Sequence, residues 1–181
     1  MKKILNIYCD ASGDGNQNDD IGIGVLFIEN EKEKFLQMRT NVKHISEYLK
    51  ISNYDDYTSG ITEAFGMLFS LKNIKKKYDK IIIYTDNIQN FYILNDIKKT
   101  NTKELRKTHQ TIINECDKLI KKNNVEIRWI KGHCGVYGNE VADRLSNASR
   151  KRQKYHPNLF KSKRKLKYRI IKNIENKNYD N

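Results

Sequence analysis

Hydrophobic and polar positions alternate along the chain with two different periods, which predicts an α/β domain. Apolar stretches typical of strands occupy residues 4–11, 21–28, 35–42, 80–85 and 125–132. Helical spacing of apolar residues marks residues 61–71, 88–97, 103–121 and 139–150. Residues 43–58 are ambiguous and fit one or two helical turns. This order predicts a five-stranded mixed sheet, with three antiparallel strands followed by two parallel ones, flanked by helices.

Two of the predicted strands end in an acid. Asp10 closes the first strand, and Asp86 follows the near-continuous apolar strand "KIIIYT". If these strands are parallel neighbours, both carboxylates emerge at the same edge of the sheet, where open α/β sheets place their sites. Glu63 lies in the first turn of one predicted helix and Asp143 early in the last one, so both can point back over that edge.

Four carboxylates at one edge require cations. Two such groups ~4 Å apart repel by ~4 kcal/mol at an effective dielectric constant of ~20. Hard oxygen ligands suit Mg²⁺ or Mn²⁺, and paired metal ions stabilise the attacking and leaving oxygens of a phosphoryl displacement. Each acid also has an ordinary structural explanation: a turn for Asp10, a helix N-cap for Asp86, and a charge near a helix start for Glu63 and Asp143.

The net charge of +13 is concentrated near the C-terminus. Residues 150–181 hold twelve of the 35 Lys and Arg residues and two of the 22 acids, which leaves 23 basic against 20 acidic residues before them. We expect a catalytic domain at residues 1–150 and a basic tail at residues 151–181. The tail favours nucleic acid over a membrane as partner, and a solubilising role stays open.

Composition also narrows the cellular setting. The chain has three cysteines, a small and odd number that argues against a disulfide framework and favours a reducing compartment. The first ten residues make a poor signal peptide, and no segment reaches the ~20 apolar residues of a membrane span. We therefore expect an intracellular protein, cytoplasmic or nuclear and not secreted, without a membrane partner.

Four segments carry the acids: "IYCDASGDGN" with Asp10, "TSGITEAFGMLFSL" with Glu63, "IIIYTDN" with Asp86, and "IRWIKGHCGVYGNEVADRL" with His133 and Asp143. In this order, over about residues 1–150, they resemble the type 1 ribonuclease H family. The last segment is the most specific, because K-G-H follows a Trp-bearing strand and precedes G-N-E-x-A-D, with the Asp ten residues after the His.

The resemblance implies a ribonuclease H-like fold and an endonuclease that cuts the RNA strand of RNA–DNA hybrids, leaving 5′-phosphate and 3′-hydroxyl ends. It implies that the site binds two Mg²⁺ ions, which Mn²⁺ can replace. Asp10 would bind both ions, and Glu63, Asp86 and Asp143 would complete their ligands. His133, on a Gly-flanked loop, would shuttle a proton or help the product leave. We expect a monomer. The residues that the resemblance implies for substrate binding are Ser12, Asn16, Thr58 and Ser59.

The chain departs from the family beside the acids. Ala11 stands where relatives usually have Gly. Residues 58–60, Thr-Ser-Gly, replace a T-N-N-like run that reaches the minor groove of the hybrid. Asn87-Ile88 replaces a frequent Ser-Gln pair. These changes predict an intact metal site with weaker or altered discrimination between duplexes.

Residues 96–124 are basic but contain no Trp, unlike the handle of some relatives. We predict instead that the tail supplies non-specific phosphate contacts. Its aromatic residues are available to stack on bases: Tyr155, Phe160 and Tyr168.

Three other interpretations remain. One is the ribonuclease H part of a retroelement polyprotein, although the Met just before the first strand and the absence of polymerase sequence favour a free-standing enzyme. A second is a catalytically weak or silent nucleic-acid-binding module, which the presence of all four acids and His133 disfavours. A third is a related integrase or resolvase, which the K-G-H and G-N-E-x-A-D arrangement disfavours.

Overall fold

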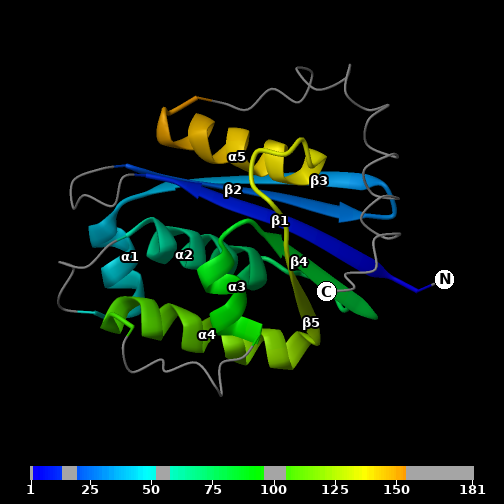
Figure 1. Ribbon diagram of the computed structural model, residues 1–181, viewed down its shortest axis with the longest axis horizontal. Helices are drawn as coiled ribbons and strands as arrows, with labels where there is room; N and C mark the ends of the chain where they lie inside the picture. The colour runs from blue at the N-terminus through cyan, green and yellow to red at the C-terminus, as the bar shows by residue number, and fades with distance from the viewer. Residues whose placement is uncertain (1, 14–19, 52–57, 96–104, 154–181) are drawn as a thin grey trace.

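A five-stranded mixed sheet forms the centre of the molecule (Figure 1). The computed structural model describes residues 2–13, 20–51, 58–95 and 105–153. The strands are β1 (Ile4–Ser12), β2 (Ile21–Glu29), β3 (Lys32–Thr40), β4 (Lys80–Thr85) and β5 (Val125–Trp129), in the order β3-β2-β1-β4-β5. β1, β2 and β3 pair antiparallel, whereas β4 pairs parallel with both β1 and β5. The predicted sheet is therefore confirmed.

Helices cover both faces of this sheet (Figure 1). On one face lies α5 (Tyr137–Arg150), over a core that includes Tyr8, Leu26 and Tyr84. The opposite face carries the larger core and the helices α1 (Val42–Leu49), α2 (Ser59–Lys72), α3 (Ile88–Asn95) and α4 (Lys107–Asn123). β1 and β4 are covered on both faces, which explains their near-continuous apolar sequences. Within the described residues, no helix combines the length and the apolar content needed to cross a membrane.

The third strand begins three residues earlier than predicted. A tight turn at Asn30 and Glu31, with φ of 46° and 66°, reverses the chain directly after β2 and starts β3 at Lys32. Such turns usually contain Gly, and here neither turn residue is Gly, so the sequence did not indicate the turn. The ambiguous segment after β3 contains α1, which ends where Lys50 adopts a left-handed conformation with φ of 56°.

Two helices also begin earlier than their apolar spacing predicts. α2 starts at Ser59, because the side chain of Thr58 accepts a hydrogen bond from the N–H of Ile61 at 3.4 Å and so caps the helix. α5 starts at Tyr137 instead of residue 139. As a result, Glu63 is the fifth residue of its helix and Asp143 the seventh of its own. The prediction that Glu63 lies in the first turn was wrong.

A buried polar chain ties three helices together beneath the start of α2. His109 of α4 is 5% exposed, and its Nε2 atom lies 2.8 Å from Oδ1 of Asn90 in α3. The amide of Asn90 donates in turn to the carbonyl of Gly60 at 2.9 Å. Burial lowers the pKa of His109, so its neutral form is favoured. These hydrogen bonds fix the N-terminus of α2, the helix that carries Glu63.

Two glycines let α5 lie directly on the sheet. A Cβ atom at Gly22 would stand 1.9 Å from the carbonyl oxygen of Ser146, and one at Gly24 would stand 2.2 Å from that of Ala142. No side chain can occupy those positions while the helix stays in place. The "IGIG" pattern of β2 therefore sets how closely α5 approaches the strands that carry the acids.

Candidate active site

Asp10 and Asp86 emerge together at one edge of the sheet. β1 and β4 pair so that Tyr8 faces Tyr84, and these two rings stack with their centroids 4.5 Å apart. Because side chains alternate along a strand, the residues two positions further on, Asp10 and Asp86, project from the same face. The prediction that the two strands are parallel neighbours is confirmed.

Glu63 completes a cluster of three acids. One carboxylate oxygen each from Asp10, Glu63 and Asp86 lie within 4.8 Å of one another. Two of these acids lie at the ends of adjacent strands and the third in α2, so residues 23 to 76 positions apart in the sequence meet here. The sequence predicted this meeting, and the geometry bears it out for these three residues.

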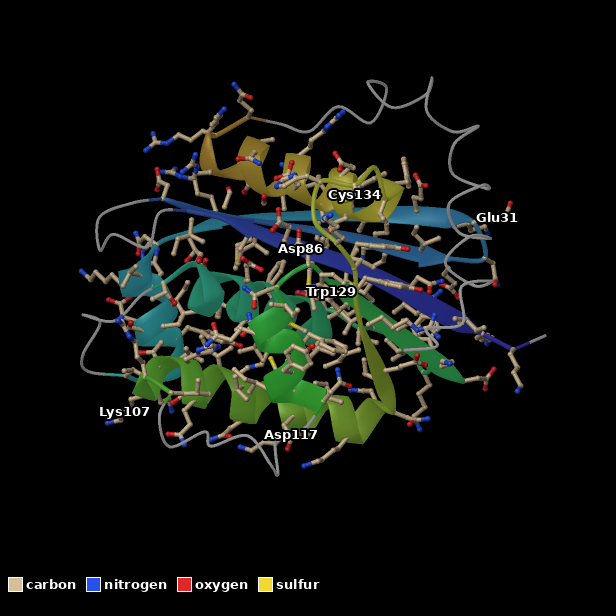
Figure 2. All side chains as sticks on the ribbon, in the orientation of Figure 1. Glu31, Asp86, Lys107, Asp117, Trp129 and Cys134 are labelled. Atoms are coloured by element: carbon tan, nitrogen blue, oxygen red, sulfur yellow. The ribbon has the colours of Figure 1, made fainter. Side chains whose placement is uncertain are left out.

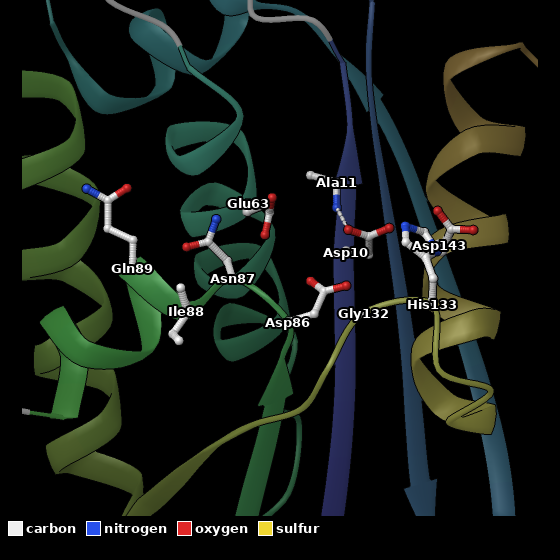
Figure 3. A pocket seen from close by; sticks show the side chains of 10 residues that line it. All are labelled: Asp10, Ala11, Glu63, Asp86, Asn87, Ile88, Gln89, Gly132, His133 and Asp143. Atoms are coloured by element: carbon white, nitrogen blue, oxygen red, sulfur yellow. Dashed lines mark hydrogen bonds between the residues drawn. The ribbon is translucent and has the colours of Figure 1, made fainter.

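Asp143 and His133 line the same pocket as the three acids. This pocket has a volume of about 450 Å³, and Figure 3 shows Asp143 and His133 on the side of Asp10 that faces away from Glu63. Asp143 comes from α5, and His133 comes from the loop between β5 and α5, where its backbone has a φ of 53°. Asp143 thus stands beside the three-acid cluster without being part of it. The remaining lining residues are Ala11, Asn87, Ile88, Gln89 and Gly132.

The ordinary structural explanations of these acids do not hold for three of the four. Asn87, not Asp86, caps α3, because its Oδ1 atom accepts a hydrogen bond from the N–H of Asn90 at 2.8 Å. An acid in the first turn of a helix stabilises the free N–H groups there, but Glu63 and Asp143 both lie beyond the first turn of their helices. Their carboxylates are therefore available to bind a ligand.

Each carboxylate has a neutral hydrogen-bond donor. The hydroxyl of Ser146 lies 3.3 Å from Oδ2 of Asp10, and the N–H of Ala11 donates to its Oδ1 at 2.8 Å. The Asn87 side chain bonds Glu63. Amide groups donate to the other two, from Asn139 to Asp86 at 3.0 Å and from Asn147 to Asp143 at 2.9 Å. By contrast, the ion pairs found among the described residues use other acids, such as Asp20, Glu29 and Glu126.

Burial and the uncompensated negative charge of the site raise the pKa values of Asp10 and Glu63. Burial, and then the charges of Asp86, Glu63 and Asp143, raise the pKa of Asp10 to about 8. Burial and the charge of Asp86 raise the pKa of Glu63 to about 7. A divalent cation would relieve this repulsion, and closely spaced hard oxygen donors are the ligand set that Mg²⁺ and Mn²⁺ prefer. The residues present therefore fit a divalent-metal site.

The predicted substrate residues differ in their settings. Thr58 caps α2 and remains exposed, as does Ser59 beside it. The hydroxyl of Ser12, the last residue of β1, is buried and has no hydrogen-bond partner in the described part of the chain. Asn16 and the tail aromatics lie outside the described residues.

Several polar residues around the site were not predicted from the sequence. Asn139 is 1% exposed and Ser146 fully buried, although both residue types are usually found at the surface. Asn139 belongs to the G-N-E-x-A-D motif, which was a usable signal. Ser146 and Asn147 belong to no such motif. Only the packing of α5 against β1 and β2 shows what they contact.

The sequence model of the RNase H family matches residues 2–151. Curated ribonucleases H from Francisella philomiragia and Francisella tularensis subsp. novicida are each 36% identical over 101 residues, which make up 51% of this chain and 64% of the relative. The chain thus spans less than two thirds of the length of these relatives.

Solved structures share the fold at low sequence identity. LC9-RNase H1, described as a type 1 RNase H with the type 2 active-site motif, is 16% identical with a TM-score of 0.62, over 85% of this chain and 75% of its own. RNase H1 from Halobacterium salinarum NRC-1 is 16% identical with a TM-score of 0.56, over 81% and 96%. LC11-RNase H1 in complex with an RNA/DNA hybrid is 13% identical with a TM-score of 0.53, over 80% and 98%.

Proposed function

The chain belongs to the RNase H family, and from this premise we propose that it hydrolyses the RNA strand of RNA–DNA hybrids internally, giving 5′-phosphate and 3′-hydroxyl ends. The observation that carries the proposal is the cluster of Asp10, Glu63 and Asp86, which lies in an open pocket. These acids accept hydrogen bonds from neutral donors, and the ion pairs found in the described part of the chain use other acids. The hybrid-bound structure of LC11-RNase H1 supports the substrate class.

In this proposal Asp10, Glu63, Asp86 and Asp143 hold two Mg²⁺ ions, which Mn²⁺ can replace. When bound, these ions supply Lewis acidity for the attacking water and for the leaving 3′ oxygen. The raised pKa values of Asp10 and Glu63 mean that both side chains release protons as cations bind near neutral pH. Cation binding and ionisation of the site are therefore coupled.

His133 is proposed to move a proton at an imidazole nitrogen during product formation. It is exposed and lines the pocket near Asp143, so it can reach a phosphate that lies over the acids. Thr58 and Ser59 are proposed to contact the sugar-phosphate backbone, since both hydroxyls are presented at the exposed N-terminus of α2. Ser12 and Asn16 complete the proposed contacts.

We propose that discrimination between duplexes is altered. Ile88 is 48% exposed at the pocket wall, where it presents an alkyl group instead of a hydrogen-bonding one. Gly60, next to Gln89 and Thr58, offers only backbone. Comparison of cleavage rates on matched RNA–DNA and RNA–RNA duplexes tests this point: equal rates would establish lost discrimination, and a large preference for the hybrid would contradict it.

The reaction itself is tested with a labelled RNA–DNA hybrid and Mg²⁺. Wild type should cut the RNA strand, and Asp86→Asn should lose activity by orders of magnitude. Asp117→Asn is a matched control, because Asp117 lies on α4 in an ion pair with Lys121, away from the pocket. Binding without cleavage by the wild type would favour the silent module, and full activity of Asp86→Asn would overturn the site.

The basic tail and the cellular setting also remain proposals. We propose that residues 151–181 contact phosphates without sequence preference, that the chain acts as a monomer, and that it works inside the cell. The buried thiols of Cys9 and Cys116 and the exposed thiol of Cys134 are all unpaired, which fits a reducing compartment.

A further inference from the structure

We propose that Ser146 and Asn147 of α5 are positioning residues, which hold Asp10 and Asp143 in the orientation that binds the cations. The inference rests on the proposed function, since it concerns the same carboxylates. It assigns a role to the second half of α5, beyond the acids and His133.

Ser146 joins the first strand to the last helix. Its side chain is fully buried, and its hydroxyl oxygen lies 2.7 Å from the carbonyl oxygen of Asp143 and 3.3 Å from Oδ2 of Asp10. The hydroxyl is therefore placed between a backbone acceptor of α5 and a carboxylate of β1. Its single proton can be donated to either acceptor, so the hydroxyl links these two elements at the point where the pocket is formed.

Asn147 fixes Asp143 at two atoms. Its Nδ2 atom lies 2.9 Å from the backbone oxygen of Asp143 and 2.9 Å from its Oδ1 atom. A carboxylate on an exposed helical surface rotates freely, whereas this one has one oxygen held by an amide. Its other oxygen stays available to the pocket that Asp143 lines.

The glycines of β2 make both contacts geometrically possible. Asp10 pairs with Gly24 across the β1–β2 ladder, and a Cβ at Gly24 would lie 2.5 Å from the N atom of Ser146. A side chain at this position would push α5 away from the sheet. The hydroxyl of Ser146 would then lose contact with Asp10.

Neutral donors suit this task better than basic residues would. A Lys or Arg beside these acids would cancel the charge that attracts a cation, whereas a hydroxyl or an amide orients the carboxylate and leaves its charge intact. Hydrogen-bond partners of metal-binding residues typically contribute about 10–100-fold to metal affinity or activity. Ser146 and Asn147 have the placement and the chemistry of such partners.

The experiment measures Mg²⁺ binding separately from catalysis. The midpoint of thermal unfolding of the full chain is followed as Mg²⁺ is titrated, and the half-saturating concentration is read for each variant. Ser146→Ala and Asn147→Ala should raise that concentration about 10-fold.

Two controls remove similar groups elsewhere. Ser149→Ala removes a buried hydroxyl one turn further along α5, and Asn123→Ala removes an amide that bonds the carbonyl of Leu119 at 2.8 Å on α4. Both should leave the half-saturating Mg²⁺ concentration unchanged. Unfolding without metal reports folding, and if Ser146→Ala does not fold, Asn147→Ala decides.

Half-saturating concentrations equal to those of the controls would overturn the inference. The result is independent of hybrid cleavage: a wild type that binds Mg²⁺ through these residues but cuts no hybrid would overturn the proposed function and leave the positioning role standing.

Discussion

The Nδ2 atom of Asn139 donates a hydrogen bond to Oδ2 of Asp86 at 3.0 Å, across 53 positions of sequence. The indole N–H of Trp129 donates to the backbone carbonyl of the same Asp86 at 3.2 Å, and Figure 2 labels both Asp86 and Trp129 at this edge of the sheet. Asp86 is thus held by β5 at its backbone and by α5 at its side chain. Its Oδ1 atom remains for a cation.

Replacement of Asn139 tests this arrangement. Asn139→Ala should lower kcat for hybrid cleavage about 10–100-fold with little change in KM, because the carboxylate loses its orientation and the substrate surface is untouched. Asn139→Asp should be worse, since a second acid would face Asp86. Steady-state kinetics provide the measurement, and a correctly folded Asn139→Ala enzyme with wild-type kcat would contradict the assignment.

Asp10→Asn should make the metal-free protein more stable while it removes activity. The raised pKa of Asp10 shows that its charge is unfavourable in the folded state, so a neutral amide of the same shape removes the cost of burying that charge near the other acids. The unfolding temperature in EDTA should rise by several degrees. The stabilisation by Mg²⁺ should fall at the same time. A lower unfolding temperature in EDTA would show that the carboxylate contributes to folding instead.

The stability of the metal-free protein should fall as the pH rises. Folded Asp10 has a pKa of about 8 against an ordinary 3.8, so its stabilising contribution is fully present below about pH 4 and is lost as the pH rises to about 8. Glu63 acts in the same direction between its ordinary 4.5 and about 7. His109 acts in the opposite direction, because its lowered pKa costs stability below its ordinary 6.5.

Unfolding temperatures measured with EDTA and with Mg²⁺ across this pH range provide the check. The gap between the two curves should widen with pH, since cations neutralise the ionised acids. A gap that is constant with pH would mean that Asp10 and Glu63 do not titrate with the metal.

Gly60→Asn should increase the preference for RNA–DNA over RNA–RNA duplexes. A Cβ at Gly60 meets only Oε1 of Gln89 at 3.4 Å and the Oγ1 of Thr58 at 3.8 Å, so a side chain fits there. The matched control is Gly60→Ala, which should stabilise α2 by up to about 1 kcal/mol without a change in preference. The ratio of kcat/KM on the two duplexes is measured, and identical ratios for both variants would refute a role for the amide.

Removal of the basic tail should weaken the salt dependence of binding. Each phosphate contact adds roughly 0.9 to the slope of log affinity against log salt concentration, so a chain that ends at Arg150 should bind hybrid with a shallower slope. Cleavage at low salt should persist, because the acids and His133 are retained. A slope equal to that of the full chain would rule out phosphate contacts from the tail.

The sequence determined the five strands and their antiparallel and parallel arrangement, the position of Asp10 and Asp86 at one edge of the sheet, and the approach of Glu63. It could do so because periodic apolar patterns report burial, and a parallel strand pair places its carboxyl ends together. The structure accounts for the buried His109 by its hydrogen bond to Asn90.

Only the tertiary structure decided which residues support the acids. A serine or asparagine on a helix has the same local sequence pattern whether it faces solvent or a carboxylate on a distant strand. Ser146, Asn147 and Asn139 contact their acids because Gly22 and Gly24 allow α5 to lie against β2, and that contact depends on packing across the sheet. The structure likewise decided that Asn87, and not the preceding Asp86, caps α3, because the helix begins one residue after Asn87. The chain sequence therefore determined where the charges gather, and the close packing of α5 decided how they are held.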